Sequence, residues 1–267
     1  HELSFVISIP ILFPCWLTRS AIVPALSQDE VFLPVSNLLE NRVNVLITVP
    51  STVSRIKAMK PNGVEELDLK VLINCGEPLH LDVLDYSIKL ANGGEVFNFY
   101  GSTEVAPWTF YHHCNKTDPE RFEPVGYAPI GKLVPGNKMH LDRETSELLV
   151  AGPQVTPGYL SEQEVSRFTI LDGVRWYRTG DKVVQQNGLY FCKGRLDAQV
   201  KLSGYRVELM DIEAHLRTLP EVNGAVCLVS QVSGQGEMIV AVLHSYRKIQ
   251  LAEVRGHLKS KLPTYMF

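Results

Sequence analysis

The chain has 267 residues, of which 45% are hydrophobic and 21% are charged, and its formal net charge is −3. This composition is typical of a soluble globular protein and excludes a disordered or fibrous one, and the length suits one large domain or two smaller ones. The near-neutral balance argues against a nucleic acid held by bulk charge. The longest apolar stretch, residues 9–17, is far shorter than the roughly 20 residues that cross a bilayer, so we expect no membrane partner.

The two ends of the sequence predict a piece of a longer chain. The sequence begins at His1 rather than methionine, opens into apolar residues without a signal-peptide pattern, and stops in the segment 262–267. A natural apolar tail is the alternative interpretation of that last segment.

Residues 43–100 show strands and a helix in alternation. Short apolar runs at 45–49, 71–75 and 96–100 each end at a proline or glycine, as buried strands do. Between the last two runs lies a helical stripe, formed by Leu81, Leu84, Ile88 and Ala91 and ended by Asn92, Gly93 and Gly94. This alternation predicts a parallel sheet with crossover helices.

Ligands of such sheets gather at the carboxyl ends of the strands. The loops 75–78 and 100–104 follow two of the predicted strands, so they lie at those ends. We therefore expect a binding site where these loops meet.

The rest of the chain changes pattern twice. Residues 125–195 contain short apolar runs separated by Gly, Pro, Asn and Asp, which is typical of β-rich structure. After Arg195 we expect a helical stripe ending near Leu219, strands at 225–230 and 238–244, and a second helix over 251–262. The predicted fold is therefore α/β: a mixed parallel-sheet subdomain and a β-rich subdomain in residues 1–196, then a small α+β lid domain in 197–267.

Three motifs carry chemistry. The first is Asn98–Glu104, where a strand ends in a glycine, two hydroxyls and a carboxylate. Glycine allows close backbone approach, hydroxyls and turn amides suit phosphate oxygens, and a carboxylate beside a phosphate suits Mg²⁺. An ordinary solvated turn is the alternative for this motif alone.

The second motif is Tyr177–Asp181, and the third runs from Gly194–Asp197 through Lys201–Glu208. An aspartate and an arginine on neighbouring turns can hold the hydroxyls of a ribose. Charged turn residues are usually just solvated, so each motif alone is weak evidence for a binding site. The three motifs in this order are specific evidence.

Together these motifs resemble the adenylate-forming superfamily, which contains adenylation domains of peptide synthetases, acyl-CoA synthetases and luciferases. The resemblance covers nearly the whole chain, through the segments 1–4, 74–77, 100–104, 147–155, 158–160, 177–181, 194–208 and 262–266. The segment 201–209 looks closest to D-alanine–carrier-protein ligases and other amino-acid-activating members. Ser102 departs from the proline that those members usually carry, which leaves the role of Thr103 intact.

The resemblance implies ATP and Mg²⁺ as cofactors and assigns roles to matching residues. Tyr100 would stack on the adenine, and Asn98 would bind its amino group. Thr103 would bind the α-phosphate, Glu104 the magnesium, and Asp181 and Arg195 the ribose. The loop residues Gly76, Glu77 and Pro78 would line the adenine, and Gly101 and Ser102 complete the nucleotide motif. Asp197 would be the hinge about which the lid domain rotates between two half-reactions.

The resemblance also implies an acyl pocket. Its residues would be Glu2, Leu3, Val6, Thr48, Ile73, Cys75, Phe99, Pro107 and Trp108. Amino-acid-activating members usually carry aspartate where Glu2 stands, and a buried ammonium needs such a partner. A solvated Glu2, or an alignment shifted by a few residues, is the alternative.

We therefore interpret the chain as part of a cytoplasmic ATP-dependent ligase. It would activate a small or compact α- or β-amino acid and load it onto the phosphopantetheine thiol of a carrier protein. The alternatives are an acyl-CoA synthetase that uses free coenzyme A and a non-catalytic nucleotide-binding scaffold. The family's phosphate loop and catalytic lysine are expected before His1 and after Phe267, so this piece alone would be a poor catalyst.

Other conspicuous residues have bland interpretations. His112 and His113 beside Cys114 look like metal ligands, but no further His or Cys lies at ligand spacing, so a solvated loop is favoured. Cys75 is interpreted as a wall residue rather than a nucleophile. The five cysteines are odd in number and widely spaced, which argues against a disulfide framework and favours a reducing compartment.

Overall fold

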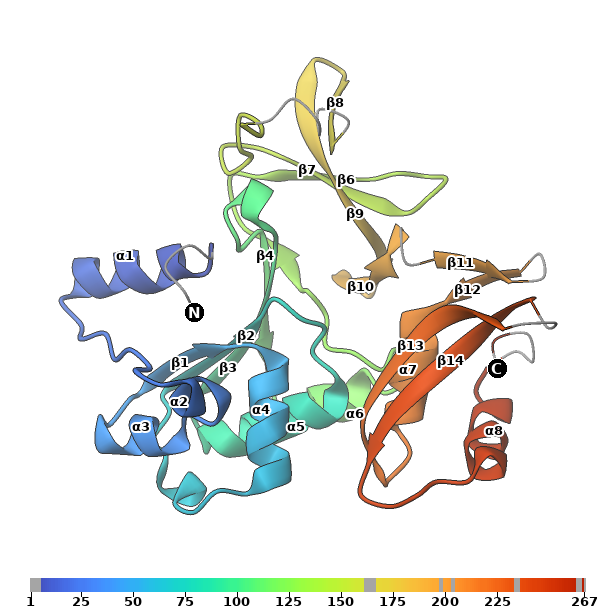
Figure 1. Ribbon diagram of the computed structural model, residues 1–267. Coiled ribbons are helices and arrows are strands. Elements are labelled where there is room, and N and C mark those ends of the chain that lie inside the picture. The colour runs from blue at the N-terminus through green and yellow to red at the C-terminus, as the bar shows by residue number, and fades with distance from the viewer. Residues whose placement is uncertain are drawn as a thin grey trace.

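The computed structural model describes residues 6–160, 167–196, 199–202, 205–232, 236–262 and 266. Its first sheet has five strands in the order β1-β2-β3-β4-β5 (Figure 1). Strands β1 (Val45–Thr48), β2 (Val71–Cys75) and β3 (Glu95–Tyr100) are parallel, and β4 (Phe110–Cys114) and β5 (Lys132–Leu133) are antiparallel. The three predicted strands and their parallel pairing are confirmed, and the sheet is mixed because β4 turns back beside β3.

Helices α4 (Pro50–Met59) and α5 (Leu81–Ala91) pack against this sheet. Helix α5 is the predicted one, and it ends at Asn92 in the left-handed conformation, as its Asn-Gly-Gly stop indicated. Buried side chains of both helices, such as Ile56 and Leu84, form one core with Leu72 of β2 and Val96 of β3. The sheet is therefore anchored on this side, and its strand ends are held in place.

Shorter elements surround this layer. They are α1 (Ser8–Thr18), α2 (Gln28–Phe32), α3 (Val35–Glu40), α6 (Asp118–Arg121) and the 3₁₀ turns η1 (Val64–Glu66) and η2 (Thr103–Val105). None of the helices in the described ranges combines the length and the apolar character that crossing a membrane requires.

The second sheet confirms the β-rich interpretation of residues 125–195. Its order is β10-β9-β7-β6, with β8 paired to β9. The strands are β6 (Lys138–Leu141), β7 (Glu147–Ala151), β8 (Phe168–Leu171), β9 (Val174–Gln186) and β10 (Leu189–Arg195). Pairing shifts register between β7 and β9 and again between β9 and β10, so β9 is irregular around Asp181. The second chemical motif lies on this irregular stretch.

The C-terminal unit has its own core. It contains the hairpins β11 (Gln199–Leu202)–β12 (Tyr205–Glu208) and β13 (Val222–Val232)–β14 (Gly236–Ser245), with α7 (Leu209–Arg217) and α8 (Leu251–Lys259). Ile212 and Leu216 of α7 pack with Leu258 of α8. Both helices end two or three residues before the predicted limits, at Arg217 and Lys259, although Leu219 and Leu262 still pack on this core. The boundary at Leu196–Asp197 stays a prediction.

His80 lies where the two units meet. It precedes α5, is 8% exposed, and its ring centroid lies 4.8 Å from that of Tyr127. Burial, together with the positive charge of Arg217 on α7, lowers the pKa of His80 to about 3. The imidazole is therefore uncharged at neutral pH.

We expect His80 to make stability depend on pH. The pKa of an unfolded histidine is near 6.5, so below pH 6.5 the unfolded chain binds a proton at His80 that the folded chain does not bind. The contribution of neutral His80 to the free energy of unfolding is fully present above pH 6.5. It is lost as the pH drops towards 3, by about 2 kcal/mol between pH 6.5 and 5. Urea unfolding of His80→Phe at both pH values should lack this part of the slope. The control His113→Phe, at an exposed histidine, should retain it.

Candidate functional site

Three residues from distant parts of the sequence meet between the two sheets. The Tyr100 hydroxyl, at the end of β3, donates a hydrogen bond of 2.5 Å to Oδ2 of Asp181 on β9. Nη1 of Arg195, at the end of β10, lies 3.2 Å from Oδ1 of the same carboxylate. Burial, and then the charge of Asp181, raise the pKa of Tyr100 well above its usual value, so the phenol stays protonated. The structure thus brings together the predicted adenine and ribose residues.

Two β-bulges produce this meeting. In β10, Cys192 pairs with Val183 and Arg195 pairs with Asp181, so the extra residue beside Gly194 sets the arginine opposite the aspartate. Gly194 has φ +113° and Gly180 has φ +71°, which is backbone that favours glycine. A Cβ on Gly180 would lie 2.8 Å from Nη2 of Arg195. Glycine at 180 therefore lets the guanidinium approach the turn that carries Asp181.

Glu147 holds this turn, and sequence reasoning missed it. The carboxylate, only 3% exposed, accepts a hydrogen bond of 2.9 Å from the amide of Gly180 and another from Arg178. Thr179 adds a bond from its hydroxyl to the carbonyl of Leu148, at 2.8 Å. A lone glutamate beside the apolar run 148–151 was the available signal.

The loop after β2 is tied to helix α4. Gly76 has φ +80°, and the carboxylate of Glu77 accepts from the amide and hydroxyl of Ser51 at 2.8 and 2.9 Å. A carboxylate at a helix N-terminus satisfies otherwise unpaired amides and complements the helix dipole. Pro78 beside it is exposed. The three predicted adenine-lining residues therefore form a turn fixed at the carboxyl end of the sheet.

Asn98 lies inside the sheet rather than at its edge. It is 4% exposed, and its Nδ2 donates to the carbonyl of Pro129 at 2.9 Å. This bond fixes the orientation of the amide plane, which sits on the same strand as Tyr100.

The segment after β3 carries the predicted phosphate and magnesium residues. Thr103 is exposed, whereas the hydroxyl of Ser102 is buried beside the side chains of Glu104 and Tyr177. Oε1 of Glu104 accepts 2.7 Å from the hydroxyl of Tyr159. Burial opposes ionisation of Glu104, but hydrogen bonding led by Tyr159 outweighs it and lowers the pKa of the carboxyl. An ionised carboxylate next to hydroxyls fits Mg²⁺, which takes one or two protein carboxylates and completes its shell with phosphate and water.

Gly101 fixes the path of this segment. A Cβ there would lie 2.1 Å from the carbonyl oxygen of Pro107, and the Thr109 amide donates to the Tyr100 carbonyl at 2.8 Å. The two ends of the loop 101–109 are therefore in direct contact. Trp108, near the end of this loop, packs beside Phe99 of β3, with ring centroids 4.4 Å apart.

The described part of the predicted acyl pocket gathers around these rings. Cys75 lies beside Trp108, and its Sγ lies 3.7 Å from the carbonyl of Thr48. Burial raises the pKa of the Cys75 thiol to about 11, so it remains protonated, as a wall residue would. The side chain of Trp108 makes a hydrogen bond with Cys75, which partly opposes the effect of burial on the thiol. Ile73 and Pro107 are buried, and Val6 is half-buried in the turn before α1.

Three predicted residues lie outside the described ranges. These are Glu2 and Leu3 of the pocket and Asp197, the predicted hinge. Their roles stay predictions.

The chain belongs to the family of AMP-binding enzymes, whose sequence pattern matches residues 1–160. A D-alanine–D-alanyl carrier protein ligase from Bacillus velezensis is 34% identical over 283 aligned residues, which cover 98% of this chain and 56% of the relative. The chain thus spans about half the length of the curated relatives that it matches.

Solved structures share the fold. The crystal structure of IdnL7 has a TM-score of 0.85 and 26% identity, and the match covers 99% of this chain and 54% of that one. A four-domain nonribosomal peptide synthetase bound to AMP and glycine has a TM-score of 0.69 and 26% identity, over 87% of this chain and 18% of that one. The predicted resemblance to the adenylate-forming superfamily is confirmed.

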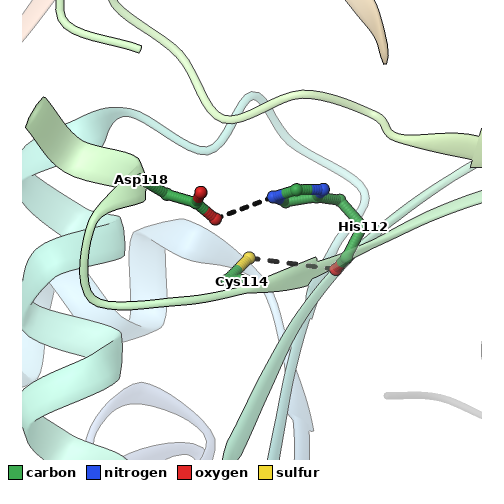
Figure 2. A group of neighbouring side chains, drawn as sticks. All are labelled: His112, Cys114 and Asp118. Atoms are coloured by element: carbon green, nitrogen blue, oxygen red, sulfur yellow. Dashed lines mark hydrogen bonds and ion pairs between the residues drawn. The ribbon is translucent and has the colours of Figure 1, made fainter. Parts of the chain in front are cut away.

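Away from the site, the interpretation of residues 112–114 as a solvated loop is wrong. They lie on β4, where His112 and Cys114 are buried and point towards Asp118 (Figure 2). His113 is exposed and stacks on Phe97. Nε2 of His112 bonds to Oδ2 of Asp118 at 2.8 Å, and Asp118 is fully buried. The partner that allows His112 to be buried is an aspartate six residues along the chain, whereas the sequence interpretation looked only for further His or Cys residues.

The Asp118 carboxylate already has its hydrogen bonds. Besides His112, it accepts from the amide and from Nδ2 of Asn115, both at 3.0 Å. Ligand-type atoms of His112, Cys114 and Asp118 lie within 4.8 Å of one another, but burial, and then the charge of Asp118, raise the pKa of the Cys114 thiol. The cluster is best explained as a structural network that joins β4 to α6.

We expect Asp118→Asn to destabilise the fold by about 2–4 kcal/mol. The amide replaces one acceptor oxygen with a donor that faces other donors, and a buried unsatisfied group is costly. Chemical denaturation of the full-length protein measures this. The control Asp68→Asn, at an exposed ion pair with Lys70, should change stability little. Equal effects of the two variants would contradict the structural role of Asp118.

Proposed function

We propose that the full-length protein activates an amino acid with ATP and transfers it to the phosphopantetheine thiol of a carrier protein. The convergence of Tyr100, Asp181 and Arg195 supports a nucleotide site, because these groups place a ring, an acceptor and a cation in direct contact with one another. Membership of the AMP-binding family and the likeness to a carrier-protein ligase support the reaction class.

The nucleotide would lie along the carboxyl ends of β2, β3 and β10 and beside the irregular stretch of β9 around Asp181. Tyr100 would stack on the adenine opposite the turn of Gly76, Glu77 and Pro78, and the Asn98 amide would meet its amino group. The Asp181 carboxylate would accept from the ribose hydroxyls, because its hydrogen bonds with Tyr100 and Arg195 hold it in one orientation. Thr103 would donate to the α-phosphate, and Glu104 would hold Mg²⁺, which neutralises phosphate charge when bound.

The chemistry is an in-line displacement. The carboxylate of the acid attacks the α-phosphorus of ATP, the bond to the bridging oxygen breaks, and pyrophosphate leaves with the electron pair. Two anions must approach each other, so the site must supply donors and positive charge to the phosphoryl oxygens. The thiol then attacks the acyl carbon of the mixed anhydride, and AMP leaves as the proton of the thiol is lost.

The pocket favours a compact acid. The contact of Phe99 with Trp108 closes the far end with two large rings, and Cys75 supplies a neutral wall. Glu2 would pair with the ammonium group, and Leu3, Val6, Thr48, Ile73 and Pro107 would complete the wall.

The thiol that accepts the acyl group and the cellular compartment are part of the same proposal. Asp197 would be the hinge that lets the C-terminal unit change orientation between activation and transfer. The five cysteines are free thiols, which suits a reducing compartment such as the cytoplasm. Mass spectrometry of a carrier protein and of coenzyme A, each incubated with the full-length enzyme and ATP, distinguishes the carrier from the acyl-CoA alternative.

We expect Asp181→Ala to lower ATP–pyrophosphate exchange by at least a hundredfold. The variant removes the acceptor for the ribose hydroxyls and the contacts that Asp181 makes with Arg195 and Tyr100. Exchange kinetics of the full-length enzyme over a range of ATP concentrations measure the loss. Asp85→Ala, at an exposed helix position, is the matched control and should retain full activity. Unchanged ATP affinity and turnover in Asp181→Ala would refute the nucleotide site.

We expect Glu2→Ala to abolish the preference for an amino acid over its deaminated analogue. An ammonium buried without a partner costs roughly 3–5 kcal/mol, or two to three powers of ten in specificity. Glu2→Asp keeps the charge and should cost less, with a shift in preference between α- and β-amino acids. Pyrophosphate exchange with matched acid pairs tests this. A wild type that prefers the deaminated acid would contradict the substrate class.

A further inference from the structure

The C-terminal unit touches the rest of the chain through one face of helix α7. Figure 1 shows this unit beside β10 and α6, at the opposite side of the first sheet from α1. Met210, Ala214 and Arg217 are spaced four and three residues apart, so they share a face of α7. Ile212 and Leu216 lie on the other side, in the unit's own core. The helix thus has one face for its own unit and one for its neighbour.

The neighbouring surface is the segment of Gly126 and Tyr127. The hydroxyl of Tyr127, which is 3% exposed, donates a hydrogen bond to the carbonyl of Met210. A Cβ on Gly126, where φ is +84°, would lie 3.2 Å from Cβ of Ala214. Small residues therefore let the helix approach the segment closely, and Tyr127 supplies a directional bond.

His80 and Arg217 surround this bond. The His80 ring packs on Tyr127, and residues 80 and 127 form an antiparallel bridge that fixes the tyrosine to the large unit. Nε of Arg217 is buried without a hydrogen-bond partner among the described residues. The Tyr127–Met210 bond is therefore a polar anchor in a contact that otherwise rests on close packing.

The same contact reaches the nucleotide site. A Cβ on Gly194, where φ is +113°, would lie 2.9 Å from Sδ of Met210. Gly194 directly precedes Arg195, whose guanidinium pairs with Asp181. Met210, whose carbonyl accepts the hydrogen bond from Tyr127, thus also packs on the β-bulge that positions Arg195.

We propose that Tyr127 is a positioning residue that docks the C-terminal unit through Met210 and thereby holds the bulge carrying Arg195. The docking part stands on geometry alone, whereas its effect on nucleotide binding rests on the proposed function. Loss of the hydroxyl should release α7 from the Gly126–Tyr127 segment and loosen the end of β10. The ring of Tyr127 would still pack on His80, so the fold of each unit should persist.

The test measures orientation without any substrate. Spin labels on non-natural amino acids at exposed positions 95 and 255 report the distance between the units in the full-length protein, with the native cysteines in place. Tyr127→Phe should raise the proportion of undocked molecules about fivefold, which is the ~1 kcal/mol of one hydrogen bond. Ala214→Leu should do the same by filling the gap to Gly126. Tyr246→Phe, at an exposed tyrosine of the same unit, should leave the distances unchanged.

The nucleotide readout is separate. Tyr127→Phe should raise the KM for ATP several-fold in pyrophosphate exchange, and Tyr246→Phe should not. Unaltered label distances in both Tyr127→Phe and Ala214→Leu would overturn the docking role. Altered distances with an unaltered KM would overturn the link to Arg195. Because the distances need no turnover, an enzyme inactive with every acid would count against the proposed function and leave the docking result standing.

Discussion

The hydrogen bond from Tyr100 to Asp181 joins the end of a parallel strand to an irregular antiparallel one. A shared apolar core, in which Phe110 of β4 packs with Leu148 of β7 and Val183 of β9, brings the two sheets together, and Tyr100 packs against this core. The carboxylate of Asp181 contacts both the phenol of Tyr100 and the guanidinium of Arg195. The turn that carries Asp181 is held by Glu147, which accepts from the amide of Gly180. Loss of any one of these groups leaves a charge or a donor without its partner, and this interdependence makes the site rigid.

Two glycines make the turn geometry possible. Gly180 and Gly194 both have positive φ, and they directly precede Asp181 and Arg195, which pair across the register shift between β9 and β10. A regular hairpin would place successive side chains on alternate faces and would separate Asp181 from Arg195. The irregularity is therefore the feature that creates the site, and the docking of Met210 on Gly194 connects it to the C-terminal unit.

The sequence predicted the regular elements well, because apolar runs and helical stripes reflect local burial. It placed β2 and α5 correctly, and it indicated the binding edge from the ends of two strands. The prediction of a solvated loop at residues 112–114 was wrong, because His112 lies on β4 and its burial depends on a hydrogen bond with Asp118. Sequence reasoning also missed Glu147 and the bulges, since register depends on tertiary pairing rather than on local pattern. The carboxyl and hydroxyl groups of the site were foreseen through the family resemblance, whereas the bonds that orient them were not.

The tight closure at Gly101 has an evolutionary consequence. Residues 103 and 104, which we propose for the nucleotide, and residues 107 and 108, which we propose for the acid, belong to one loop. The ends of this loop come into close contact because Gly101 has no side chain. A substitution that reshapes the acid pocket therefore shifts the phosphate-side residues as well. New acid preferences in this lineage should arise more readily from pocket walls on other elements, such as Cys75 on β2, than from within this loop.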